Sequence, residues 1–244
     1  MTRPSAMAGA IGSAPGTGNG RRTRQPRSSE RPGEGTIGKA AEQWHGSAMC
    51  NEQRRRVALG QVRNDWSQTR IPLVFPEGLP NLAPLDSIRI TDRNAIIRAS
   101  SQQEGAAELV VRRWSWPGPG GKPVYNYRAE GRDFARGRCL ILADGFYEFT
   151  TPAEAGKKRK DKWLFTLAGE EWFCIAGLWR SDPKVGEAYT MLTTEPGADV
   201  APYHNRQIVV LGRADWARWL DPAVPAAELT RPLPAGSLEV EQVG

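Results

Sequence analysis

The amino-acid sequence predicts an α+β fold, in which a single domain of mainly antiparallel β-strands forms a curved, barrel-like sheet with a few peripheral helices. After residue 50, short runs rich in β-branched and aromatic residues alternate with turn-forming residues at intervals typical of an antiparallel sheet. Helical periodicity is limited to two short segments. No internal repeat is visible, and a chain of 244 residues is long enough for one substantial core.

The first 48 residues differ in composition from the rest of the chain. They contain nine Gly, few large apolar side chains and no sustained period, which predicts a disordered extension at 1–48 that is not part of the mature protein. They also carry seven Lys/Arg and three Glu, so +4 of the formal net charge of +6 belongs to them and +2 to residues 49–244. A protein that coats DNA has a large positive excess in its folded part. We therefore expect any nucleic-acid contact to come from a local groove.

Apolar runs and cysteines argue against two classes of protein. The longest apolar runs are far shorter than the roughly 18 residues that a membrane-spanning helix needs, so we expect no membrane segment. Cys50, Cys139 and Cys174 form no C-x-x-C pair, which argues against a disulfide framework and against a zinc site. The sequence thus predicts a cytoplasmic, monomeric protein that uses no metal and no cofactor.

The predicted elements follow one another at short intervals after residue 50. In chain order they are a helix at 51–66, hairpins at 87–99, 138–150 and 162–180, strands at 189–194 and 206–212, and a helix at 213–220. The basic run at 154–162 is expected to be a solvated hairpin loop. The folded domain is expected to span 49–235 and to be followed by a C-terminal tail at 236–244.

Two side chains of the predicted domain are candidates for acid–base chemistry. Alternation places Phe146 and Glu148 on one face of their strand and Tyr147 and Phe149 on the other. A carboxyl among apolar neighbours keeps its proton to higher pH, which suits general acid–base catalysis. An outward-facing glutamate on an edge strand is the alternative for Glu148. His204, the one histidine after residue 48, precedes a predicted strand, although a lone histidine is more often structural.

Arginines and tryptophans are candidates for contacts with nucleic acid. Arg128 in NYRAE and Arg206 in HNR are candidate phosphate ligands, because a guanidinium matches phosphate oxygens in geometry. Either arginine can instead be a surface charge. Trp114 and Trp116, in VVRRWSWPGPGG, are able to stack on unpaired bases, or else to pack in the core.

The chemistry of Cys50 depends on where the mature chain begins. If Met49 is the first residue and is removed, Cys50 carries an α-amine and a thiol on adjacent carbons, which together form a 1,2-aminothiol. The amine of such a group forms an imine with an aldehyde, and the sulfur then closes a five-membered thiazolidine ring. An α-amine is roughly one-tenth neutral at pH 7, whereas a lysine amine is almost wholly protonated. The alternative for Cys50 is a small buried hydrophobe.

Four stretches of the sequence resemble motifs of the SOS-response-associated peptidase (SRAP) family, in the family's order. They are MCN at 49–51, NYRAE at 126–130, RCLILADGFYEF at 138–149 and HNR at 204–206. The resemblance covers essentially all of the chain after residue 48, and the third stretch is the most specific. It implies a protein that senses abasic sites in single-stranded DNA and crosslinks to them covalently through an N-terminal cysteine, which protects the lesion during the DNA-damage response. Lyase and autopeptidase activities, and association with the nucleoid when bound to DNA, are implied as well.

The resemblance also implies catalytic roles for four residues. Cys50 corresponds to the nucleophile and Asn126 to the asparagine that orients it. Glu148 corresponds to the acid–base group that helps to open the sugar ring, and His204 to the histidine that assists at the sugar oxygen.

Four further residues match the family's DNA-binding positions. Arg128 and Arg206 match arginines that hold the phosphates beside the lesion, and Pro84 and Trp114 match residues close to the DNA. The sequence departs from the family pattern at Asn51-Glu52, where Gly-Arg is usual, and in the loop that follows Trp114. The first departure affects a contact at the amino terminus, and the second affects the DNA-facing loop.

Two other functions fit the same residues. A thiol peptidase would use Cys50 and His204 as a dyad, acting on the protein's own leader. A non-catalytic single-strand binder would use the arginines and tryptophans alone. The crosslinking protein needs an aldehyde and a free Cys50 amine, the peptidase needs a thiol and a peptide, and the binder needs neither.

Overall fold

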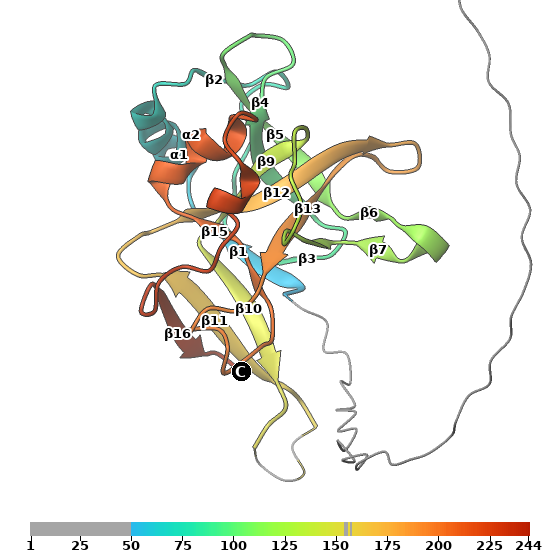
Figure 1. Ribbon diagram of the computed structural model, residues 1–244, viewed down its shortest axis with the longest axis vertical. Helices are drawn as coiled ribbons and strands as arrows, with labels where there is room; N and C mark the ends of the chain where they lie inside the picture. The colour runs from blue at the N-terminus through green and yellow to red at the C-terminus, as the bar shows by residue number, and fades with distance from the viewer. Residues whose placement is uncertain (1–49, 154–155, 157) are drawn as a thin grey trace, which may run out of the picture. The chain divides into compact units, whose positions relative to one another are not determined.

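The structure is a computed structural model that describes residues 50–153, 156 and 158–244. The predicted extension at 1–48 lies outside the described residues. In the described part the chain is mostly β, with a closed barrel, a second five-stranded sheet and two α-helices (Figure 1). The predicted fold class, a barrel-like arrangement of mainly antiparallel strands with peripheral helices, is confirmed.

Five strands close the barrel. Around the ring their order is β13, β12, β9, β4, β5 and back to β13. The first four pairings are antiparallel, and the one that closes the ring, in which Tyr189 faces Trp114, is parallel. The strands are β4 (Arg93–Ala99), β5 (Ala107–Trp114), β9 (Arg138–Ala143), β12 (Phe173–Asp182) and β13 (Gly186–Thr194).

The second sheet is antiparallel throughout and has the order β16, β11, β10, β1, β3. Strand β10 is therefore its central strand, and β16 and β3 are its edges. The strands are β1 (Glu52–Arg55), β3 (Leu85–Arg89), β10 (Gly145–Thr150), β11 (Asp161–Leu167) and β16 (Leu238–Gln242). Residues 238–242, which we expected in a C-terminal tail, thus form an edge strand of this sheet.

Shorter elements complete the described part. The two-residue or three-residue strands β2 (Leu73–Val74), β8 (Asn126–Arg128), β14 (Gln207–Ile208) and β15 (Val210–Leu211) pair with barrel strands, while β6 (Trp116–Pro117) and β7 (Pro123–Val124) form a separate ribbon (Figure 1). The helices are α1 (Leu59–Trp66), α2 (Arg213–Leu220) and the 3-10 turns η1 (Ser67–Thr69), η2 (Pro119–Gly121) and η3 (Ala226–Glu228).

The predicted hairpins contain real strands, but their pairing was predicted wrongly. In each of the three, the first strand belongs to one sheet and the second strand to the other. Asp144 alone separates β9 from β10, which is too short for a hairpin turn. Its carboxylate accepts hydrogen bonds from the Arg54 side chain and the Arg56 main-chain N–H, so the chain is fixed where it crosses between the sheets. Strand β10 instead forms a hairpin with β11, and the predicted basic loop connects these two strands.

The first predicted helix is correct only in its second half. Residues 52–55 form β1, which lies between β10 and β3, and α1 begins at Leu59. Each residue of β1 pairs with β10, with β3 or with both, and this tertiary gain exceeds the weak helix preference of the sequence. The second predicted helix, at 213–220, matches α2 and is confirmed.

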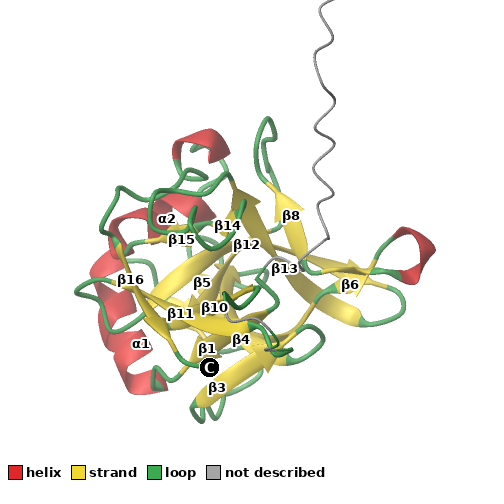
Figure 2. Ribbon diagram, turned by 90° about the horizontal axis from the view of Figure 1, so that it is seen from below, coloured by secondary structure: helices red, strands yellow, loops and turns green. Residues whose placement is uncertain are grey.

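Two buried clusters hold the layers together, and β9 contributes to both. Leu140 and Leu142 point into the cluster that the helices cover, whereas Ile141 points into the cluster shared with the second sheet. Trp66 of α1 stacks on Trp216 of α2, with ring centroids 6.2 Å apart. Figure 2 shows both helices on the same side of the molecule, and Figure 1 shows the strands of the second sheet, β10, β11 and β16, below the helices. Among the described residues no helix is long and apolar enough to cross a membrane.

Candidate active site

Three of the predicted catalytic residues meet at Cys50. The main-chain N–H of Cys50 donates a hydrogen bond to Glu148 Oε1 at 3.2 Å, and the side-chain amide of Asn126 donates to the Cys50 carbonyl oxygen at 3.3 Å. The Cys50 sulfur lies 3.8 Å from the carbonyl oxygen of Glu52. Asn126 of β8 and Glu148 of β10, which are 76 and 98 residues away from Cys50 in the sequence, therefore converge on one residue. This contact supports the predicted proximity of the nucleophile, its orienting amide and the acid–base group.

The position of Glu148 follows from the packing of β10. Phe146 and Glu148 share the inner face of this strand, as alternation predicts, and Phe146 stacks on Phe165 of β11 at 4.9 Å. Gly145 allows the close approach of the two strands, because a Cβ at this position would lie 2.7 Å from Leu164 Cδ1. The alternative of an exposed glutamate on an edge strand is wrong, since β10 is central and Glu148 is 1% exposed.

Burial dominates the electrostatics of this pair. Loss of solvent raises the pKa of Glu148 to about 8, against a smaller lowering by the hydrogen bond from the Cys50 N–H. Burial also raises the pKa of the Cys50 thiol well above its usual range, and the negative charge of Glu148 raises it further. At neutral pH the structure thus favours a protonated carboxyl beside an undissociated thiol.

His204 belongs to the same neighbourhood through the residue before it. Tyr203 packs on Trp163 and Phe165 of β11, with ring centroids 4.7 and 5.3 Å away, and Trp163 is the register partner of Glu148. The Arg206 main-chain N–H donates to His204 Nδ1 at 3.1 Å, which orients the ring. Tyr203 was not singled out from the sequence, although an aromatic residue beside a lone histidine was a usable signal.

The two predicted phosphate-binding arginines differ in their surroundings. Arg128 is exposed at the end of β8. Arg206 forms a two-armed ion pair with Glu130 and also donates to Thr193 Oγ1 at 3.1 Å. Glu130 was missed as a partner, although it lies in the NYRAE stretch. Arg206 therefore has a positioning role in the protein itself, and Arg128 is the arginine that is open to a ligand from solvent.

The remaining two predicted DNA contacts, Trp114 and Pro84, differ in exposure. Trp114 is 0% exposed, donates its indole N–H to the Tyr125 carbonyl oxygen and stacks on Tyr189, so its ring is in the core and is not available to a base. The prediction that Trp114 contacts DNA is therefore corrected to a core role. Pro84 is exposed, and Arg55 holds the carbonyl groups of the two residues before it.

A buried ion pair next to Cys50 was not anticipated. Glu52 accepts a hydrogen bond from Lys162 Nζ at 2.8 Å, and the ammonium also lies 3.8 Å from the centroid of the Tyr147 ring. Lys162 comes from the end of the basic run, which we expected to be solvated. The ion pair ties β11 to the start of β1.

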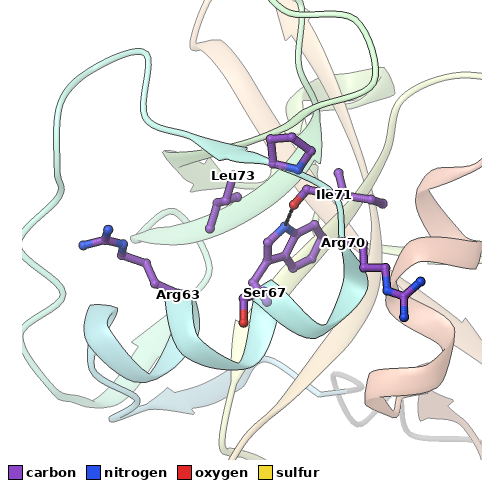
Figure 3. A pocket seen from close by; sticks show the side chains of 7 residues that line it. Arg63, Ser67, Arg70, Ile71 and Leu73 are labelled. Carbon is purple, nitrogen blue, oxygen red and sulfur yellow. Dashed lines mark hydrogen bonds between the residues drawn. The ribbon is translucent and has the colours of Figure 1, made fainter.

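One pocket in the described part of the chain lies beside α1 and is lined by none of the candidate residues. It has a volume of about 360 Å³, and the indole N–H of Trp66 donates to the Ile71 carbonyl oxygen there (Figure 3). Arg63 and Arg70 extend from its two sides. No cluster of three or more potential metal ligands occurs in the part of the chain that the structure describes.

The fold and this site define a class of protein: a β-barrel with an added sheet, in which a buried glutamate of the central strand contacts the main chain of a cysteine. Comparison with known sequences identifies the particular family, because residues 80–244 match the family described as SOS response associated peptidase (SRAP). The chain belongs to the SRAP family, as the sequence motifs predicted.

Similarity to individual proteins is more distant. The chain is 32% identical over 125 residues to the abasic site processing protein HMCES of Gallus gallus, an alignment that covers 39% of this chain and 35% of HMCES. It is 30% identical over 114 residues to the abasic site processing protein YoqW of Bacillus subtilis, covering 43% of this chain and 50% of YoqW. The chain thus spans about a third to a half of the length of these curated relatives.

Solved structures show the same fold. A protein from Bacteroides thetaiotaomicron aligns with a TM-score of 0.61 at 16% identity, covering 80% of this chain and 92% of the other. A phage-related protein from Bordetella bronchiseptica aligns with a TM-score of 0.58 at 21% identity, covering 80% and 94%.

Proposed function

We propose that this protein senses abasic sites in single-stranded DNA and crosslinks to them covalently through Cys50, which protects the lesion. The observation that carries the proposal is the contact between the Cys50 nitrogen and Glu148 Oε1 at 3.2 Å in a buried site. Membership of the SRAP family and the names of the curated relatives support a role in abasic site processing.

The working form begins at Cys50 in this proposal. With residue 49 attached, the Cys50 nitrogen is an amide whose lone pair is delocalised into the carbonyl group, so it is not nucleophilic. Once residue 49 is removed, the same nitrogen is an α-amine beside the Glu148 carboxyl. An α-amine has an ordinary pKa close to neutrality, so a useful fraction is uncharged without any special environment.

The chemistry then needs no reactant beyond the amine, the thiol and the aldehyde, and Glu148 transfers the protons. The neutral amine adds to the C1 aldehyde of the opened sugar, and Glu148 gives a proton to the resulting hydroxyl, which leaves as water, and takes back the proton that the nitrogen loses as the C=N bond forms. The Cys50 sulfur adds to the C=N bond while its proton passes to the nitrogen, and a thiazolidine ring results. One water is released overall and no redox partner is involved. Because the S–H proton moves during ring closure, the raised pKa of the thiol does not prevent the step.

The other residues hold the reacting groups and the DNA in place. Asn126 fixes the Cys50 carbonyl group, so the α-carbon that carries both nucleophiles cannot swing away from Glu148. His204 assists at the sugar oxygen, and Arg128 binds a phosphate beside the lesion. Arg206 acts through its ion pair with Glu130, which keeps the β8 segment next to the loop of His204.

The experiment compares two abasic substrates and two amino termini. A chain that begins at Met49 and loses it, as verified by mass spectrometry, is expected to give a denaturation-resistant adduct with a single-stranded oligonucleotide containing an abasic site. The same oligonucleotide with C1 reduced to the alcohol should give none, and neither should a chain proven to retain residue 49. Equal adduct on the reduced site, or a stable adduct from the retained chain, would contradict the aminothiol mechanism.

A thiol peptidase that uses Cys50 and His204 is the second candidate, favoured by the cysteine itself and by the family's descriptive name. The surroundings of the sulfur argue against it as the main activity. Cysteine peptidases react through a thiolate, and both burial and the charge of Glu148 oppose ionisation of the Cys50 thiol. Release of a peptide from full-length protein by purified wild type, and not by Cys50→Ala, would support this activity.

A further inference from the structure

The pocket beside α1 has no role in the chemistry above, and hydrogen bonds hold its walls in place. The side chain of Trp66, which is 1% exposed, fixes the Ile71 carbonyl group through its indole N–H at 2.8 Å. The Ala107 N–H donates to the carbonyl oxygen of Pro72, the next residue, at 2.8 Å. The pocket of about 360 Å³ is therefore preformed, and its volume falls in the range of small-ligand pockets, roughly 300–1,000 Å³.

The pocket and Cys50 lie against different parts of the core. Trp66 belongs to the buried cluster that the helices cover, and Ile71 and Leu73 pack against the same cluster. Cys50 belongs to the cluster that the barrel shares with the second sheet. Leu73 lies on β2, the last strand in the order of its sheet, so in the described chain no further strand pairs with it on its outer side. A ligand in this pocket therefore does not occupy the candidate active site.

Two unpaired arginines give the pocket its charge. Arg63, in the last turn of α1, and Arg70, directly after η1, line it from two sides (Figure 3). Both are exposed, and neither guanidinium group forms an ion pair or a hydrogen bond with another residue in the described part of the chain. Asp65, the acidic residue of α1, is bound to Arg213 at 2.9 Å and so does not neutralise either of them.

The backbone of Arg70 adds a second observation. Its φ of 61° and ψ of 10° lie in the left-handed region. Glycine is the usual residue in this region at the end of a helix, and a side chain there carries a conformational cost. The protein thus bears a cost for an arginine whose charge none of the described groups uses.

Aliphatic side chains line the same pocket. Ile71 and Leu73 are half-buried and Pro72 is exposed, so part of their apolar surface is open to solvent. The ring of Trp66 is buried and is not free to stack on a nucleobase. An aliphatic side chain matches this surface better than a base does, and carboxylates match the guanidinium groups. The lining therefore favours an acidic peptide over a nucleic acid.

The spacing of the two arginines sets the pattern of such a peptide. Arg63 and Arg70 are seven residues apart on a mostly helical segment, which is roughly 11 Å at 1.5 Å per residue. In an extended peptide, residues four apart are separated by about 13 Å, and every second side chain points to the same side. Acidic residues two positions before and two positions after an apolar residue therefore have a matching separation and share its side of the chain.

We propose that this pocket is a docking site for an extended acidic peptide of a partner protein, in which one carboxylate on either side of an apolar residue occupies the second position from it. The apolar side chain contacts Ile71 and Leu73, and the two carboxylates pair with Arg63 and Arg70. The site goes beyond the proposed chemistry at Cys50, because it would attach the protein to a partner while leaving the candidate active site open.

Two capped peptides of the same composition test the pattern. Asp-Ser-Leu-Ser-Asp has the proposed spacing, whereas Ser-Asp-Leu-Asp-Ser places both carboxylates on the opposite side of the extended chain from the leucine. Each is titrated into full-length isotope-labelled protein while the NMR signals of the Trp66 indole N–H and of Leu73 are followed. We expect the first peptide to shift both signals with a Kd about 2-fold to 30-fold lower than the second, as two exposed ion pairs imply. Equal Kd values, or no shift of either signal, would overturn the proposal.

The variant Arg70→Gly separates binding from folding. Glycine adopts the left-handed conformation without strain, so the urea midpoint should stay the same or rise. The Kd for Asp-Ser-Leu-Ser-Asp should rise about 2-fold to 5-fold, and Arg63→Ala should have a similar effect. Arg231→Ala is the matched control, because Arg231 is exposed and lies outside the pocket. An unchanged Kd in both pocket variants would exclude the two arginines as the binding groups.

Two measurements separate this site from DNA binding. We expect a single-stranded thymidine oligonucleotide not to displace Asp-Ser-Leu-Ser-Asp from the pocket. Displacement by the oligonucleotide, with weaker oligonucleotide binding in Arg70→Gly, would assign the pocket to nucleic acid and overturn the peptide proposal. Crosslinking of Arg70→Gly to abasic DNA should proceed at the wild-type rate, and a slower rate would contradict the independence of the two sites.

Discussion

Replacing Glu148 by Gln should change how the stability of the protein depends on pH. The carboxyl is 1% exposed, and burial raises its pKa from an ordinary 4.5 to about 8. Because the folded-state pKa is the higher one, the native state binds this proton more tightly than the unfolded chain. The stabilisation is therefore fully present below pH 4.5 and is lost as the pH rises through about 8.

The magnitude follows from the size of the shift. Each pKa unit corresponds to about 1.36 kcal/mol, so a shift of this size is worth about 3–6 kcal/mol. Glutamine keeps the shape and does not titrate. The prediction applies to protein that retains residue 49 and so has an amide at Cys50. Between pH 4 and pH 9, the free energy of unfolding of wild type should fall by that amount relative to that of Glu148→Gln.

Urea unfolding at a series of pH values measures the difference. Glu130→Gln is a matched control of opposite sign, because the hydrogen bond from Arg206 lowers the pKa of Glu130 and its contribution is lost on acidification. In chains that begin at Cys50, the α-ammonium group lies beside Glu148 and lowers its pKa, so the loss at high pH should be smaller. If wild type and Glu148→Gln lose stability in parallel from pH 4 to 9, the carboxyl does not have the raised pKa in this form of the protein, and burial does not dominate its electrostatics.

Three more predictions concern the supporting residues. Asn126→Ala should slow crosslinking in single-turnover assays with little change in DNA affinity, since the amide holds the Cys50 carbonyl; a pure affinity loss would contradict this. Arg128→Ala should raise the Kd for single-stranded DNA and reduce the salt dependence of binding by roughly one phosphate contact; equal salt slopes for this variant and wild type would remove Arg128 from the interface. Arg206→Ala should lower thermal stability, because Glu130 loses its ion-pair partner. Gly145→Ala should cost about 1 kcal/mol of unfolding free energy, because Leu164 Cδ1, 2.7 Å from the new methyl group, has to move and the Phe165 main-chain oxygen lies 3.3 Å away; an unchanged urea midpoint would refute the close packing.

The strands could be predicted from the sequence, but their partners could not. Runs such as RCLIL and FYEFT have the composition and alternation of strands, and β9 and β10 form there. A single residue, Asp144, joins them, and its role depends on Arg54, which is 90 residues away in sequence. Local patterns carry no information about such long-range contacts, so the hairpin was the natural but wrong pairing.

The candidate site was predictable to a similar extent. Family motifs singled out Cys50 and Glu148, and the structure brings them within hydrogen-bond distance. Trp114 was assigned to a DNA contact by the family resemblance, with core packing as the alternative from its residue type, and the parallel pairing of β5 with β13 buries it against Tyr189. The ion pair between Glu52 and Lys162 joins residues 110 apart in the chain, so neither charge could be recognised as paired from sequence alone.

The order of the second sheet predicts that the strands carrying the candidate residues exchange their amide hydrogens at different rates. Glu148 lies on β10, which has two strands on either side. The amide hydrogens of β10 therefore exchange with solvent only when the sheet opens. Arg128 and the residues beyond Arg206 lie on β8 and β14, strands of three and two residues. We expect hydrogen exchange to be slow on β10 and much faster on β8 and β14. In the proposed function, Glu148 would then be held still, while the segment of Arg128, which we propose to bind a phosphate, would adjust to the DNA.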